Sequence, residues 1–227
     1  MKNALIVLPC LALISLAACS PPAPPASTTE PLEAPAIARN AGDQPAGPVL
    51  DAGAVFDGEF KGCRGKASGP ASACVPDQLE SLGASDAAVA VSRAISSEGT
   101  PGYVSDWQQI EGVGVATIAY PLRANANEGA LLIDSEGRWI DVDADPLPAQ
   151  ARAREPVSTW LQAHPKANPI VPAQAEGTRG GEDGGVELVY ASEMRDCRAC
   201  KTHATLRIAY QFDKDRRYIG QRVLELR

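Results

Sequence analysis

The sequence predicts an α+β fold, in which an antiparallel sheet carries helices on one face. Two runs have the apolar spacing of helices, and each is followed by several runs in which apolar and polar residues alternate. Alternation with a period of two is typical of antiparallel strands that have one solvated face. Helices and antiparallel strands grouped in this order define the α+β class.

The first predicted helix covers Ser85–Ser97 (SDAAVAVSRAISS). Ser85 suits the N-cap position, Asp86 suits the first turn, and Ala and Val recur at helical spacing. Strand-like runs then follow at Tyr103–Gln109, Val113–Tyr120, Ala130–Asp134 and Arg138–Val142.

The second predicted helix covers Ala151–Ala163 and is interrupted or begun by Pro156. The polar, glycine-rich run Gly177–Gly185 has no Lys-Ser/Thr pair after it, so it predicts a hairpin loop and no phosphate-binding loop. Strand-like runs lie at Pro169–Ala173, Val186–Ala191, Ala204–Asp213 and Tyr218–Glu225.

Two segments of these halves align without gaps. Ile133–Ile140 (IDSEGRWI) matches Phe212–Ile219 (FDKDRRYI), so that a hydrophobe, an Asp, a polar turn, an Arg, an aromatic and an Ile recur in order. Both predict a hairpin whose turn begins at the Asp. One explanation is a duplication with repeats at about 85–145 and 150–227. The other is that hairpins of this composition are common.

The N-terminus has the features of an export signal. Lys2 precedes the apolar run Ala4–Leu16, which is shorter than the roughly 20 residues needed to cross a bilayer. Small residues then lead into Cys19 in the run LAAC. This run resembles the lipobox of bacterial lipoproteins. The resemblance implies that residues 1–18 are a signal peptide and that Cys19 carries the lipid that anchors the mature chain to a membrane. Several acyl chains hold a protein there stably.

The residue after Cys19 is Ser20, whereas an Asp retains such lipoproteins at the inner membrane in enteric bacteria. The resemblance therefore favours the outer membrane, on its periplasmic face. Residues 19–50 are rich in Pro, Ala, Ser and Thr, a composition that cannot bury enough apolar surface to fold and predicts an extended tether. Residues 51–227 are then the periplasmic α+β domain.

Charge is unevenly distributed along this acidic chain, which has 21 basic and 28 acidic residues. The C-terminal part is basic, which could indicate an anionic partner. Its cations alternate with apolar residues, as on the polar face of strands, and an exported protein rarely meets nucleic acid. We therefore expect no nucleic-acid partner. The cations are Arg195, Arg198, Lys201, Arg207, Lys214, Arg216, Arg217, Arg222 and Arg227.

Besides Cys10 in the leader and Cys19, four cysteines remain: Cys63, Cys74, Cys197 and Cys200. An even number in an oxidising compartment predicts two disulfides, although four cysteines allow three pairings. A bridge between Cys63 and Cys74 would close a Gly- and Ser-rich loop and contribute on the order of 3 kcal/mol in the chain-entropy model.

The C-x-x-C run Cys197–Cys200 has four interpretations. A thioredoxin-like redox motif needs a helix N-terminus, but predicted strands flank this run; nearby Arg and Lys would still favour a thiolate. A c-type haem site would need His where Lys201 stands. Zinc could recruit His164 and His203, but oxidation would consume the thiolates first. The fourth is a small structural disulfide that closes a hairpin loop, and this is our prediction.

Other motifs are weaker. Asp141–Asp145 (DVDAD) opens like a calcium-binding EF-hand loop, but Pro146 and Arg152 stand where that loop needs Gly and Glu. The chain has two histidines and no G-x-S-x-G elbow, so no hydrolytic triad is evident. We assign no catalytic residue, no metal and no cofactor. Single aromatics in strands are usually part of a core, as expected for Trp107, Trp139 and Trp160.

The sequence thus predicts a non-enzymatic envelope lipoprotein whose domain binds a macromolecule in the periplasm, most simply another protein. Lipoproteins of the inhibitor or immunity type, which block wall-degrading enzymes, have the same location and the same kind of tethered domain. This is an analogy without a matching motif. The alternatives are a thiol–disulfide oxidoreductase that uses Cys197 and Cys200, and a structural or assembly accessory of the cell envelope.

Overall fold

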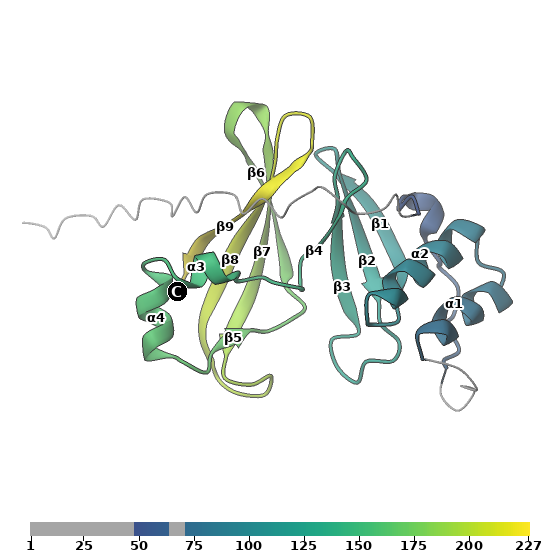
Figure 1. The fold of residues 1–227 in the computed structure, drawn as a ribbon, viewed down its shortest axis with the longest axis horizontal. Coiled ribbons are helices and arrows are strands. Elements are labelled where there is room, and N and C mark those ends of the chain that lie inside the picture. The colour runs from purple at the N-terminus through teal and green to yellow at the C-terminus, as the bar shows by residue number, and fades with distance from the viewer. Residues whose placement is uncertain (1–47, 64–70) are drawn as a thin grey trace, which may run out of the picture. The chain divides into compact units, whose positions relative to one another are not determined.

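The structure is a computed structural model that describes residues 48–63 and 71–227 (Figure 1). The predicted signal peptide, Cys19 and most of the predicted tether lie outside these residues. The described chain is α+β, with antiparallel strands in two sheets, as the sequence predicts.

The N-terminal sheet is a four-stranded meander in the order β1-β2-β3-β4. A 3-10 turn and two helices precede it. The elements are η1 (Ala52–Ala54), α1 (Ala71–Ser81), α2 (Asp86–Ser97), β1 (Tyr103–Ile110), β2 (Val113–Ala119), β3 (Glu128–Ile133) and β4 (Trp139–Asp141).

The C-terminal sheet follows α3 and α4, and its strands β7, β8 and β9 also form a meander. Both β5 and β6 pair with β7. Because β8 occupies the other edge of β7, the two short strands share the remaining edge. The elements are α3 (Ala149–Arg152), α4 (Val157–Ala163), β5 (Asn168–Pro169), β6 (Gln174–Gly180), η2 (Glu182–Gly184), β7 (Val186–Arg195), β8 (Thr202–Phe212) and β9 (Tyr218–Leu226).

Local chemistry explains the helix boundaries. The Ser85 hydroxyl accepts a hydrogen bond from the Ala88 N–H at 3.0 Å, so Ser85 caps α2 as predicted. Pro156 occupies the N-cap position of α4 and separates it from α3, which confirms an interruption of the second predicted helix. Helix α1 was not predicted, because Pro76 lies inside it; Val75 and Leu79 are fully buried and hold it in place.

Two boundaries differ from the sequence predictions. Leu50, assigned to the tether, is buried against Val91 and Ile118, so the folded part begins before Asp51. The run Gly177–Gly185 is only partly a loop, since β6 extends to Gly180. Every residue of β6 is exposed, so this strand lacks the apolar alternation by which strands are recognised.

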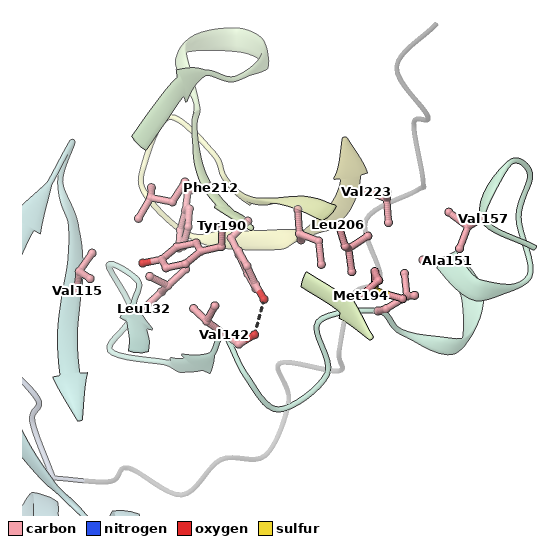
Figure 2. Packing of buried hydrophobic residues seen from close by; sticks show 14 of the residues in the cluster. Val115, Leu132, Val142, Ala151, Val157, Tyr190, Met194, Leu206, Phe212 and Val223 are labelled. Atoms are coloured by element: carbon pink, nitrogen blue, oxygen red, sulfur yellow. Dashed lines mark hydrogen bonds between the residues drawn. The ribbon is translucent and has the colours of Figure 1, made fainter. Parts of the chain in front are cut away.

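The core has separate parts on the two faces of the N-terminal sheet. Ala116 and Ile118 of β2 pack with Val91 of α2, whereas Val113 and Val115 join the cluster that contains the C-terminal sheet. This sheet is therefore covered on both faces, and the expectation of one wet face is wrong for β2. In Figure 2, Val115, Leu132 and Val142 lie toward Phe212 and Tyr190, while Met194 lies toward Ala151 and Val157.

The two hairpins that align in sequence have the same turn. In the β3–β4 turn, Asp134 Oδ1 accepts the N–H groups of Glu136 and Arg138, each at 2.9 Å. In the β8–β9 turn, Asp213 Oδ1 accepts the N–H groups of Asp215 and Arg217, also at 2.9 Å. The predicted Asp-initiated hairpins are confirmed. A duplication of whole halves is not confirmed and stays a prediction.

The turns differ at their left-handed positions. Gly137 has φ +77° in one, whereas Arg216 has φ +63° in the other, where a side chain is unfavourable. The Arg216 guanidinium donates to the carbonyl oxygens of Glu111 and Gly184, which lie just before β2 and β7. These hydrogen bonds compensate for the left-handed backbone conformation of Arg216, which glycine would adopt more easily.

The β3–β4 turn also binds the second hairpin. Asp134, whose side chain is 0% exposed, accepts at Oδ2 from the Arg138 guanidinium and from the Tyr218 N–H at 3.1 Å. Arg138 Nη2 donates in turn to the Tyr218 carbonyl at 3.1 Å, and the Ser135 N–H donates to the Arg216 carbonyl at 3.0 Å. This Asp134 junction therefore connects the two sheets through hydrogen bonds.

Substituting Asp134→Asn should lower the free energy of unfolding by about 3 kcal/mol, because a buried amide N–H group would face the Arg138 and Tyr218 donors and the charged hydrogen bonds to them would be lost. Urea unfolding followed by circular dichroism would measure the loss. The matched control is Asp213→Asn, whose amide oxygen can still accept the turn N–H groups and which should cost less than about 1 kcal/mol. Equal losses for the two variants would contradict a special role for the junction.

Candidate functional site

The connection between β7 and β8 carries the C-x-x-C run at the end of the longest hairpin. Arg195 pairs with Thr202 at the end of the ladder, so residues 196–201 form the loop. Cys197 and Cys200 are joined by a disulfide, and the Cys200 N–H donates to the Cys197 carbonyl at 3.0 Å. Cys197 is exposed. The run thus lies between two strands, as the sequence predicts.

The second disulfide joins Cys63 to Cys74 of α1. The two cysteines are 11 positions apart in the sequence, and residues 64–70 between them lie outside the described part of the chain. Cys63 is buried at 6% exposure, and the bond attaches the segment after η1 to the helix layer. The burial of Cys63 favours a structural role for this bond.

Arg195 fixes the shape of the β7–β8 loop. Its Nε donates to the Thr202 hydroxyl at 2.9 Å, and Nη1 donates to the Arg198 carbonyl at 2.7 Å. Its Nη2 donates to the Glu193 carboxylate, which also accepts from Thr202. The charge of Arg195 is therefore matched locally by Glu193.

Arg198 lies beside a pocket of about 290 Å³. The pocket opens where the chain between β5 and β6 leaves the edge of β7, and Arg198 Nη2 donates across to the Val171 carbonyl. The lining combines apolar residues of the segment between β5 and β6 with charged side chains of β7 and the β7–β8 loop. The lining residues are Ile170, Val171, Pro172, Gln174, Ala191, Ser192, Glu193, Arg195, Arg198 and Thr205.

The two histidines of the chain lie next to each other near this loop, with their rings tilted by 40°. The rings of His164 and His203 have centroids 5.0 Å apart, and Trp160 stacks on His164 at 4.4 Å. His203 Nε2 is 3.2 Å from an Asp196 carboxylate oxygen. Within residues 48–63 and 71–227, no group of three or more His, Cys, Asp or Glu side chains is placed to hold a metal ion. The sulfurs of Cys197 and Cys200 are bonded to each other, so in this oxidised form they do not serve as thiolate ligands.

Asp143 of the DVDAD run has a structural partner far along the chain. Its carboxylate accepts the Ala173 N–H at 2.8 Å and so attaches the segment before β6 to the end of β4. Burial raises the pKa of Asp143 to about 6, helped by the nearby Asp141 charge and opposed by the Ala173 hydrogen bond and Arg123. Burial likewise raises the pKa of Tyr190 to about 12.

Two of the basic C-terminal residues pair with acids on neighbouring strands of the C-terminal sheet. Arg222 donates two hydrogen bonds to Glu187, whose side chain is 4% exposed, and Gln211 donates to the same carboxylate. Arg207 pairs with Glu176. Arg207 and Arg222 therefore lie on strands, as the alternation predicts, and are matched by acids from β6 and β7. The prediction is wrong for most of the other cations: those of the β7–β8 loop, those of the β8–β9 turn, and Arg227 after β9 lie outside the strands.

The three tryptophans contact the core. Trp107 and Trp139 pack against the cluster between α2 and the N-terminal sheet. Trp160 packs against the large cluster that includes the C-terminal sheet. The prediction of a packing role is confirmed for all three.

No protein family, curated protein or solved structure shows significant similarity to the chain. A search of the described residues for membrane-spanning helices finds none that is sufficiently long and apolar. The candidate site is therefore defined by its own geometry. The sequence pointed to Cys197, Cys200 and their cations, but it gave no sign of the pocket, whose Arg198–Val171 contact joins residues 27 positions apart.

The raised pKa of Asp143 predicts a pH-dependent stability. Since the folded state holds this proton up to about pH 6 and the unfolded state releases it near pH 3.8, the stabilising contribution is present below pH 3.8 and is lost as the pH rises through 6. Relative to Asp143→Asn, the wild-type free energy of unfolding should fall by on the order of 2 kcal/mol between pH 4 and pH 7.

Urea midpoints at pH 4, 5, 6 and 7 would measure this difference. Asp106→Asn, at an exposed position of β1, is the matched control and should follow the wild-type pH profile. The prediction would be wrong if Asp143→Asn also followed it.

Proposed function

We propose that this chain is a lipid-anchored envelope lipoprotein, without enzymatic activity, whose α+β domain binds another protein in the periplasm. The LAAC run ending at Cys19 supports the anchor, and the Ser20 that follows supports the outer membrane. Two disulfides within the described residues fit an oxidising compartment.

The observation that carries binding is the pocket beside the β7–β8 loop. It combines apolar residues with cationic side chains at the exposed end of the longest hairpin. Its volume of about 290 Å³ is at the lower end of the range for small-molecule sites, which suits one protruding side chain of a partner. Recognition by an anchored inhibitor or immunity protein would use such a surface.

One experiment tests anchor and partner together. Wild-type chain should carry metabolically incorporated palmitate, fractionate with membranes, and give a discrete crosslinked adduct with one envelope protein. Cys19→Ser should lose the label and leave the membrane fraction, yet form the same adduct when mixed with envelopes, because binding resides in the domain. Palmitate on the variant would contradict the anchor, and the absence of any adduct would contradict the partner.

A second candidate function is thiol–disulfide exchange at Cys197 and Cys200. The exposure of Cys197 and the cations around it favour this activity. The flanking strands β7 and β8 oppose it, because they provide no helix N-terminus to stabilise a Cys197 thiolate.

Redox titration followed by alkylation and mass spectrometry separates the two functions. A structural Cys197–Cys200 bond should have a midpoint below about −300 mV, whereas an oxidoreductase would titrate between about −120 and −270 mV. A midpoint near −200 mV, together with isomerase activity that Cys197→Ser abolishes, would contradict the non-enzymatic proposal and support thiol–disulfide exchange.

A further inference from the structure

The charges around the pocket do not cancel. Arg195 is engaged by Glu193, so this pair is internally neutral and Arg195 acts as a positioning residue. Arg198 is exposed, and within the described part of the chain its guanidinium makes one hydrogen bond, to the Val171 carbonyl. A guanidinium has five N–H donors. Most donors of Arg198 are therefore available to an incoming acceptor at the pocket.

The remaining lining sets the shape of that acceptor. Ile170, Val171 and Pro172 contribute apolar surface to the lining, and Arg198 contributes its guanidinium. A guanidinium binds a carboxylate through two parallel hydrogen bonds, a geometry that a neutral amide cannot match. The matching group is a carboxylate on a short apolar stem.

The disulfide controls where Arg198 lies. Arg198 is one of two residues between the bonded cysteines, and its carbonyl is held by Arg195 at 2.7 Å. A dithiol reductant would convert the bond into two thiols and become a cyclic disulfide itself, which leaves only hydrogen bonds to define the loop. The position of the Arg198 guanidinium over the pocket therefore depends on the oxidation state of the loop.

We propose that this pocket binds a carboxylate of the partner protein, that Arg198 recognises it, and that the Cys197–Cys200 disulfide holds Arg198 in position. This inference rests on the proposed protein-binding function and names the group that is bound. An acidic side chain and a free C-terminus present the same chemistry, and different probes distinguish them.

The test uses the mature lipidated chain in detergent micelles, observed by NMR. The probes are N-acetylglutamate α-methylamide for a side chain, N-acetylleucine for a C-terminus, and N-acetylglutamine α-methylamide as the neutral control. One of the two acids should give saturable shifts of the Ile170 and Val171 amides and of the Arg198 Nε–H. The neutral amide should bind at least about tenfold more weakly.

Three variants complete the test. Arg198→Gln should weaken binding of the acid at least about tenfold, whereas Lys201→Gln, in the same loop but outside the pocket lining, should leave it unchanged. Dithiothreitol, or the double variant Cys197→Ser/Cys200→Ser, should weaken binding to the Arg198→Gln level. Amide spectra would confirm that each variant is folded.

Equal binding of acid and amide, or equal effects of the Arg198 and Lys201 substitutions, would overturn the carboxylate site. Unchanged binding after reduction would overturn the role of the disulfide. If the envelope adduct forms equally with wild type and Arg198→Gln, the pocket inference fails while the proposed function stands. If no adduct forms at all, the proposed function fails.

Discussion

The burial of the Asp134 carboxylate constrains how the β3–β4 and β8–β9 hairpins meet. Its oxygens need donors in the interior, and those donors come from its own turn and from the backbone of the β8–β9 hairpin. A carboxylate with so many directed partners can be satisfied in one arrangement of the two hairpins. Because each hairpin belongs to a different sheet, the same hydrogen bonds set how the sheets meet.

Strands β7 and β8 of the C-terminal sheet are longer than the strands of the N-terminal sheet, so their two ends face different parts of the molecule. Strand β8 has 11 residues and β7 has 10, whereas β2 and β3 have seven and six. The Phe212 end of the long strands lies toward the N-terminal sheet, and the Met194 end lies toward α3 and α4 (Figure 2). The β7–β8 loop and its pocket are therefore at the end of the hairpin away from the Asp134 junction.

Sequence reasoning was correct for features that depend on residues close together in the chain. The Ser85 cap, the Asp134 and Asp213 turns and the alternating strands are short-range features, and each was predictable. It failed where tertiary contacts override local preference, as for α1 with its internal Pro76 and for the fully exposed β6. The site was predictable as a cysteine loop. The pocket was not, because Arg198 meets Val171 only after β5, β6 and β7 assemble.

The twin turns of the two hairpins differ in how much sequence change they can tolerate. Asp134 and Asp213 begin the same turn, but Asp134 also accepts a hydrogen bond from the Tyr218 N–H of the other hairpin. At the left-handed position the roles are reversed: Gly137 contributes backbone freedom, whereas Arg216 contributes a side chain that holds two loops. An identical substitution at matching positions would thus have unequal consequences. The two turns are alike in geometry, yet the contact with a neighbouring segment is made by the first residue of one turn and by the left-handed residue of the other.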